Sequence, residues 1–145
     1  MSEKIKLSLD LVNESDCADL VIELLIDNQS FYTNKVIPGT HSLSHEVNLE
    51  EGDRTFDIVL SGKTSEHTKI DEAGNIVSDV LIKITNIALD DINIDQLMSE
   101  QAVYTHDSNG TTELTEHKFF GPMGCNGTVT LKFTSPFYLW LLENM

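Results

Sequence analysis

The sequence is poor in positive charge. Only nine Lys and Arg residues stand against 24 Asp and Glu, so the 145-residue chain has a formal net charge of -15. Proteins that bind nucleic acids or anionic lipids use clustered Lys and Arg to displace counterions from phosphates. The sequence has no such basic cluster, so its composition argues against DNA, RNA and membrane surfaces as partners and predicts a negative molecular surface.

Cysteine and long apolar runs are also scarce. Cys17 and Cys125 lie far apart, which does not make a disulfide framework, and we interpret both as thiols. Met1–Lys6 leads directly into alternating residues without the apolar stretch of a signal peptide, so we expect synthesis in a cytoplasm. The apolar residues 136–142 are too few for a membrane anchor, which needs roughly 20 residues. They indicate either an inter-subunit contact of a homo-oligomer or a buried central strand.

Several segments alternate apolar and polar residues, the period of a strand with one solvent-facing side. The first is Ile5–Leu11. Leu43–Leu49 and Phe56–Leu60 follow the same period and are separated by turn residues 50–53, so we interpret them as a hairpin. Val129–Phe133 restores the period near the end of the chain.

Turn signals between other apolar runs indicate further strands. Leu20–Ile26 is apolar at nearly every position and predicts a buried strand or a short helix, with Phe31–Val36 returning after the turn residues Asp27–Ser30. Val80–Ile94 predicts another strand with a sharp bend at Asp90–Asp91. These features favour β-structure over helix in both regions.

The pattern as a whole predicts an all-β fold. About eight strands at short spacing, without a long amphipathic helix or an internal repeat, are typical of a two-sheet antiparallel β-sandwich, jelly-roll-like in topology. The length of the chain suits one domain over residues 1–145. Residues 95–127 show no sustained period, and irregular segments of this length are frequently functional.

Two groups of acidic residues are candidate calcium ligands. Asp107, Asn109 and Glu113 place oxygen ligands close together around a glycine. Asp91 and Asp95 share one face of an extended segment. The simpler alternatives are a solvated turn and an acidic strand end. Calcium is therefore the predicted cofactor at these five positions.

Aromatic and histidine side chains in the loops are candidate ligand-binding residues. Sugar recognition needs an exposed aromatic face beside a few polar groups. We assign this role to Tyr104, His106, Phe119 and Phe120, and Tyr32 is a further aromatic of this kind. The alternative for each aromatic ring is burial in the core.

The remaining histidines give a weak metal signal. His41 and His45 lie four apart on a predicted strand, about 13 Å from each other, so they cannot share one ion. His106 and His117 could converge within the irregular segment, but they lack the spacing of a recognisable zinc site.

No motif of a catalytic nucleophile is present. The sequence has no Gly-x-Ser-x-Gly elbow, and Cys125 has no positioned base. We therefore predict that the chain is not an enzyme. A hydrolase that uses a pair of carboxylates stays open as an alternative, because no pair is singled out among the 24.

Three stretches resemble uncharacterised proteins of tailed phages that infect marine cyanobacteria: His67–Asp71, Tyr104–Asp107 and Met123–Leu142. That resemblance implies no settled activity. It implies that the protein acts in the host cytoplasm or in the phage particle.

A looser resemblance is to calcium-dependent xylan-binding modules, which are small β-sandwiches. It rests on Leu49–Gly52, Phe56–Ile58 and Ile82–Ile94. The resemblance implies an ion that is held by carboxylates and backbone carbonyls and that contacts sugar hydroxyls. This chain has no clear Trp or Tyr beside its Asp cluster.

These observations predict a non-enzymatic binding module of phage origin that recognises a glycan with the help of calcium. The alternative is a phage structural or assembly protein that acts through protein contacts. The predicted partner is thus a glycan or a protein surface.

Overall fold

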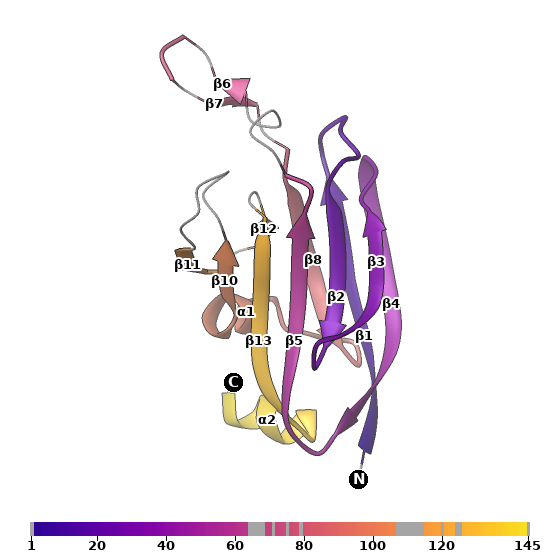
Figure 1. Ribbon diagram of the computed structural model, residues 1–145. Helices are drawn as coiled ribbons and strands as arrows, with labels where there is room; N and C mark the ends of the chain where they lie inside the picture. Colours follow the sequence, from indigo (N-terminus) through magenta and orange to yellow (C-terminus); the bar gives the residue numbers. More distant parts are fainter. Residues whose placement is uncertain are drawn as a thin grey trace.

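Two antiparallel β-sheets pack face to face in the computed structural model of the chain (Figure 1). The structure describes residues 2–63, 69–70, 72–74, 76–78, 80–106, 115–119, 121–123 and 126–144. The five-stranded sheet has the order β12-β8-β1-β4, with β9 paired to β8. Its strands are β1 (Ser2–Asn13), β4 (Gly39–Glu50), β8 (Ile82–Leu89), β9 (Ile92–Asn93) and β12 (Pro122–Met123).

The second sheet has six strands in the order β11-β10-β13-β5-β2-β3. They are β2 (Val21–Ile26), β3 (Gln29–Lys35), β5 (Gly52–Ser61), β10 (Val103–His106), β11 (Thr115–Lys118) and β13 (Gly127–Ser135). A separate pair, β6 (Lys69–Ile70) and β7 (Ile76–Ser78), extends from one end of the sandwich (Figure 1). The antiparallel two-sheet sandwich predicted from the sequence is confirmed.

The alternating residues of the long strands form the core between the sheets. Ile5, Leu7, Leu9 and Leu11 of β1 are at most 2% exposed. They face buried side chains of the six-stranded sheet, namely Ile22, Leu24, Ile58, Leu60, Val129 and Leu131. The period of two in the sequence therefore identifies the buried face of each of these strands correctly.

Short turns of left-handed residues close two of the strand pairs. Asp27 and Asn28 have φ of 50° and 65° and join β2 to β3, while Asp90 and Asp91 have φ of 50° and 67° and join β8 to β9. Two successive left-handed residues suit the twist of a hairpin, and Asp and Asn tolerate this conformation better than most residues. The predicted return of the chain after the turn Asp27–Ser30 and the predicted bend at Asp90–Asp91 are both confirmed.

The hairpin predicted for Leu43–Leu49 and Phe56–Leu60 is wrong. These segments form β4 and β5, but β4 pairs with β1, whereas β5 pairs with β13 and β2. The chain therefore crosses from one sheet to the other at the turn before Gly52. Alternation reports only which face of a strand is buried, and both sheets face the same core, so the partner strand could not be derived from it.

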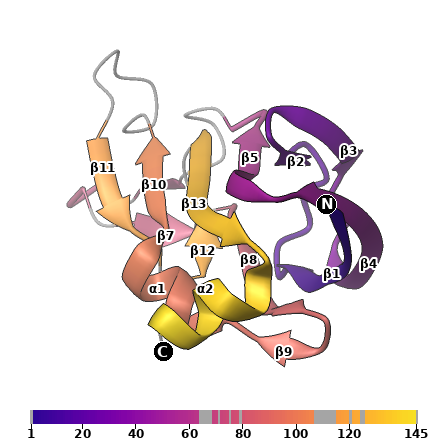
Figure 2. The same ribbon diagram turned by 90° about the horizontal axis from the view of Figure 1, so that it is seen from below.

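The structure also contains two short helices that the sequence pattern did not indicate. Helix α1 (Asp95–Gln101) lies in the segment predicted to be irregular and buries Leu97 and Met98. Helix α2 (Phe137–Asn144) covers most of the apolar end, for which an inter-subunit contact and a buried central strand were the two alternatives, and it rules out the strand. It lies across one end of the sandwich (Figure 2).

Helix α2 is held by both apolar and polar contacts. Phe137, Trp140 and Leu141 are buried, and the rings of Phe133 and Trp140 lie 6.1 Å apart. The Glu3 carboxylate accepts hydrogen bonds from the Ser135 hydroxyl and, at 2.8 Å, from the Phe137 N–H. These contacts tie the start of β1 to the end of the chain.

The opposite side of α2 faces solvent. Its side chains Leu139 and Leu142 are 59% and 76% exposed. The Tyr138 hydroxyl donates a 2.9 Å hydrogen bond to Asp90, and this bond raises the pKa of Tyr138. Among the described residues, no helix has the length and apolar character needed to cross a membrane.

Hydrogen bonds on the outer face of the five-stranded sheet link three of its strands. The Asp10 carboxylate of β1 accepts from the Asn86 amide of β8 at 2.8 Å and from the Ser42 hydroxyl of β4 at 2.7 Å. Both hydrogen bonds lower the pKa of Asp10, and the bond from Asn86 has the larger effect.

Replacement of Ile58 by Ala tests the core of the six-stranded sheet. Ile58 is fully buried, so the variant should lose about 2–5 kcal/mol of unfolding free energy through lost apolar burial and the cavity left behind. Val59 is half-buried on the other face of β5, and Val59→Ala should lose clearly less. Urea unfolding measures both values, and equal losses would contradict this assignment of faces.

Candidate functional site between strands β3 and β4

The sandwich is open along the side where β3 and β4 lie next to each other. β3 is the last strand of the six-stranded sheet and β4 the last strand of the five-stranded sheet, and both stand on the same side of the molecule (Figures 1 and 2). Two clefts lie between them. We call the first, of about 470 Å³, the Tyr32 cleft, and the second, of about 530 Å³, the Arg54 cleft.

Polar residues at core-facing positions of β4 explain why this side stays open. His41, Leu43 and His45 continue the alternation that leads to the buried Val47 and Leu49, but these three side chains are only half-buried. Imidazole rings need hydrogen-bond partners or water, which a closed apolar core does not supply. This part of the space between the sheets is therefore accessible from solvent.

A group of rings separates the two clefts. The His45 ring lies 5.6 Å from the ring of Phe31 and 5.6 Å from the ring of Tyr32, measured between centroids. Phe31 and Tyr32 follow each other on β3, where the pairing with β2 shifts between Leu24 and Leu25. All three rings are half-buried. We refer to Phe31, Tyr32 and His45 as the ring cluster.

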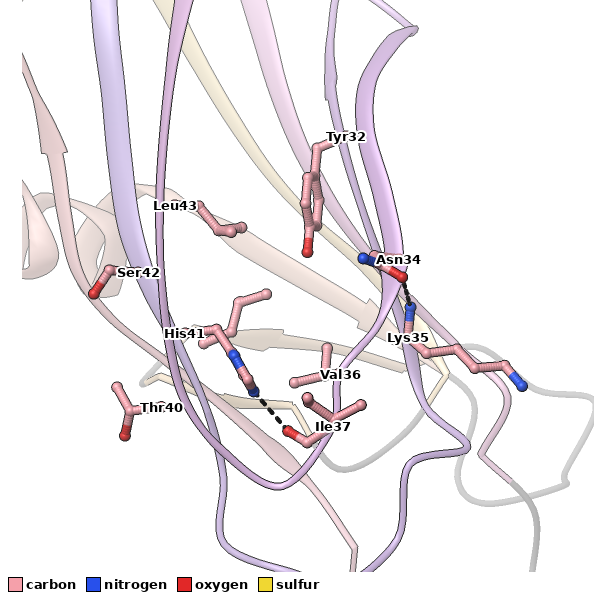
Figure 3. Close-up of a pocket in the computed structure, with 10 residues that line it drawn as sticks. Tyr32, Asn34, Lys35, Val36, Ile37, Thr40, His41, Ser42 and Leu43 are labelled. Atoms are coloured by element: carbon pink, nitrogen blue, oxygen red, sulfur yellow. Dashed lines mark hydrogen bonds between the residues drawn. The ribbon is translucent and has the colours of Figure 1, made fainter.

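The Tyr32 cleft combines an aromatic ring with hydrogen-bonding groups. Figure 3 shows the Tyr32 hydroxyl pointing into the cleft towards the His41 side. His41 Nε2 donates a 2.8 Å hydrogen bond to the Ile37 carbonyl. Because a carbonyl only accepts, that nitrogen must carry hydrogen, and Nδ1 of the neutral ring can accept a hydrogen bond. Asn34 contributes an amide at the rim.

The Arg54 cleft carries charged groups of both signs. Arg54 donates a 2.8 Å hydrogen bond to one oxygen of Asp27, and the other Asp27 oxygen accepts the Thr55 N–H at 3.0 Å. Glu46 and Glu50 also line this cleft. Its neutral polar groups come from Gln29, Ser30 and Asn48.

In the sequence, Tyr32 stands out only as one of several loop aromatics, and His41 and His45 only as candidate metal ligands. Both histidines lie on β4, as expected, and point to the same side of the strand. Their residue type was the available signal: a histidine at a core-facing position of an alternating strand indicates an incompletely closed core.

Two of the predicted ligand-binding residues belong to the core, which corrects that prediction. Tyr104 is 7% exposed and Phe119 is 2% exposed, so neither offers an aromatic face to a sugar. The alternation within β10 turns Tyr104 inwards. The His106 ring lies 4.5 Å from that of Tyr104 and stacks on His117 at 5.0 Å. Phe120 lies outside the described residues.

The predicted metal ligands Asp91 and Asp95 have other partners. The Asp95 carboxylate accepts the N–H groups of Asn86 at 3.0 Å and of Ile87 at 2.8 Å. Asp91 forms a 2.8 Å ion pair with Lys6, and this contact raises the pKa of Lys6. These engaged carboxylates do not fit a shared calcium site, since Asp95 accepts two backbone N–H groups of β8 and Asp91 is paired with Lys6.

The other predicted ligands, Asp107, Asn109 and Glu113, lie outside the described residues. Within the part of the chain that the structure describes, no three His, Cys, Asp or Glu side chains are grouped so that they could hold a metal ion. Asp95 and Phe119 do meet in a small cavity of about 150 Å³, which Thr85 and Ser99 also line.

The role of Asp95 is testable by substitution. Asp95→Ala should cost about 1–3 kcal/mol of unfolding free energy, because two backbone N–H groups lose their acceptor. Asp91→Asn, which keeps a residue that tolerates the left-handed conformation, should leave stability nearly unchanged, because the Asp91 pair is exposed. Chemical denaturation compares the two, and an equal loss would contradict the backbone role of Asp95.

Comparison with known proteins supports the fold assignment. No family model and no curated protein matches the chain. A solved structure described as "vCBM60 in complex with galactobiose" is similar to it with a TM-score of 0.50 and 9% sequence identity, over 87% of this chain and 96% of that chain. At this identity the likeness shows a shared β-sandwich fold. The resemblance to phage proteins stays a prediction.

Proposed function

We propose that this protein is a non-catalytic carbohydrate-binding module that holds its ligand in the Tyr32 cleft. The observation that carries the proposal is the open side of the sandwich, where an aromatic ring and several hydrogen-bonding groups line one cleft. The fold likeness to a module solved with galactobiose supports it.

The residues of the Tyr32 cleft suit the chemistry of a sugar. A pyranose has apolar C–H faces and a rim of hydroxyl groups, so it needs an aromatic surface and groups that donate and accept hydrogen bonds. Tyr32 provides the ring and a hydroxyl, His41 an acceptor nitrogen, and Asn34 an amide. The volume of about 470 Å³ lies within the usual range of ligand sites.

The same cleft argues for binding without hydrolysis. Glycosidases place two carboxyl groups on either side of the bond that they cleave. The described residues that line the Tyr32 cleft include neither Asp nor Glu. A sugar bound there would meet no acid and base pair from these residues.

Calcium assistance and phage origin are the finer parts of the proposal. Calcium assistance rests on Asp107, Asn109 and Glu113, which lie close together in the sequence. Their side chains carry oxygen ligands of the kind that this ion prefers. Phage origin rests on the sequence resemblance.

A role in protein contacts is the second candidate. The observation that favours it is the exposed apolar side of α2, where Leu139 and Leu142 face solvent. A structural or assembly protein would use such a surface to meet a partner or a second copy of the chain.

Tyr32→Ala tests the proposed site. The variant should bind galactan or xylan oligosaccharides roughly tenfold more weakly or worse, since a central aromatic anchor contributes about 2 kcal/mol. Tyr138→Ala, which removes an exposed tyrosine from α2, is the matched control and should bind like the original protein. Isothermal titration calorimetry measures the affinities, and circular dichroism checks the folding of both variants.

The original protein should bind at least one of these oligosaccharides. A protein that bound none of them would refute the carbohydrate module and favour the protein-contact role. Equal affinity of Tyr32→Ala and the original protein would show that the ligand does not bind in the Tyr32 cleft.

The calcium part is tested by thermal unfolding of chelator-stripped protein with and without millimolar calcium. An ion that binds only the folded state must raise the unfolding midpoint. We expect a rise that disappears in the variant Asp107→Ala with Asn109→Ala and persists in Asp91→Asn. An unchanged midpoint in the original protein would exclude the calcium site.

A further inference from the structure

The two clefts lie one after the other along the same pair of strands. His41 lines the Tyr32 cleft and Val47 lines the Arg54 cleft, while His45 stands between them in the ring cluster. These residues point to the same side of β4. The seven residues from His41 to Val47 span about 20 Å along an extended strand. The open side is thus an elongated surface.

The ring cluster does not close this surface to a ligand. Phe31, Tyr32 and His45 each keep part of the ring accessible to solvent, because all three are half-buried. Phe31 lines the Arg54 cleft and Tyr32 lines the Tyr32 cleft, so the two neighbouring rings of β3 serve one cleft each. A polysaccharide chain that lies over the ring cluster would contact apolar ring surface in its middle and polar groups at both ends.

The charges along this surface select against an anionic ligand. Asp27, Glu46 and Glu50 outnumber Arg54 in the second cleft, and Arg54 is already paired with Asp27. In the first cleft, Lys35 extends away from the cavity (Figure 3). The chain as a whole has a net charge of -15, which adds a repulsive field for acidic sugars. The neutral amide of Gln29 remains for hydrogen bonds to hydroxyls.

We infer that the ligand is an internal stretch of a linear, uncharged polysaccharide that runs along β3 and β4 and occupies both clefts. This inference rests on the proposed function and deepens it. A disaccharide fills the Tyr32 cleft alone. Longer polysaccharide chains cross the ring cluster and also bind to Gln29 in the Arg54 cleft.

The test compares ligand lengths by calorimetry. Galactobiose and xylobiose are titrated against the longer oligomers of the same sugars, up to six units. Affinity should rise severalfold with length and then level off, because additional units reach the Arg54 cleft until it is filled. Galactan should bind, and polygalacturonate, its acidic counterpart, should not.

A variant in the second cleft separates the two ends of the surface. Gln29→Ala should weaken binding of the longest oligomer severalfold and leave the disaccharide unchanged. Gln96→Ala, which alters an exposed glutamine on α1, is the matched control and should change neither affinity.

The possible failures are distinguishable. If disaccharide and hexasaccharide bind equally tightly, or if Gln29→Ala weakens the binding of both alike, the extended site is refuted while the module remains. Binding of polygalacturonate as tight as that of galactan would refute the selection for uncharged chains. The absence of binding to every one of these sugars would overturn the proposed function together with this inference.

Discussion

Burial of the alternating apolar face of β1 is the constraint on which the rest of the structure depends. β1 pairs with β4 on one side and with β8 on the other, so it holds the five-stranded sheet together. Its four inward side chains pack against the six-stranded sheet and set the spacing between the layers. Because β1 has β4 as its outer neighbour, β4 becomes an edge strand, and the open side with its two clefts follows from that position.

Polar groups at the margins of this core decide where the sandwich closes. Glu3 joins β1 to the start of α2, and Asp95, the first residue of α1, accepts two N–H groups of β8, so both helices are tied to the sandwich. On the side of β3 and β4 the corresponding positions are His41 and His45, which require contact with water or polar atoms. The same core thus ends in a closed surface at one margin and in a ligand-sized opening at another.

Negative charge shapes what this opening can receive. Three of the described basic residues, Lys6, Arg54 and Lys83, form ion pairs with carboxylates and so neutralise local negative charge. Such pairs contribute little to stability. They leave a surface that repels polyanions, whereas aromatic rings and amides remain for uncharged ligands. Composition and geometry therefore favour the same class of partner.

The sequence by itself determined the fold class, the buried faces of the strands, the turns at Asp27–Asn28 and Asp90–Asp91, and the net negative charge. These properties depend on residue type and on a local period of two. Only the tertiary structure decided that β4 and β5 belong to different sheets, that residues 137–144 form a helix, and that Tyr104 and Phe119 are core residues whereas Tyr32 borders a cleft. Strand partners and exposure depend on contacts between residues far apart in the chain, which alternation along one segment does not encode.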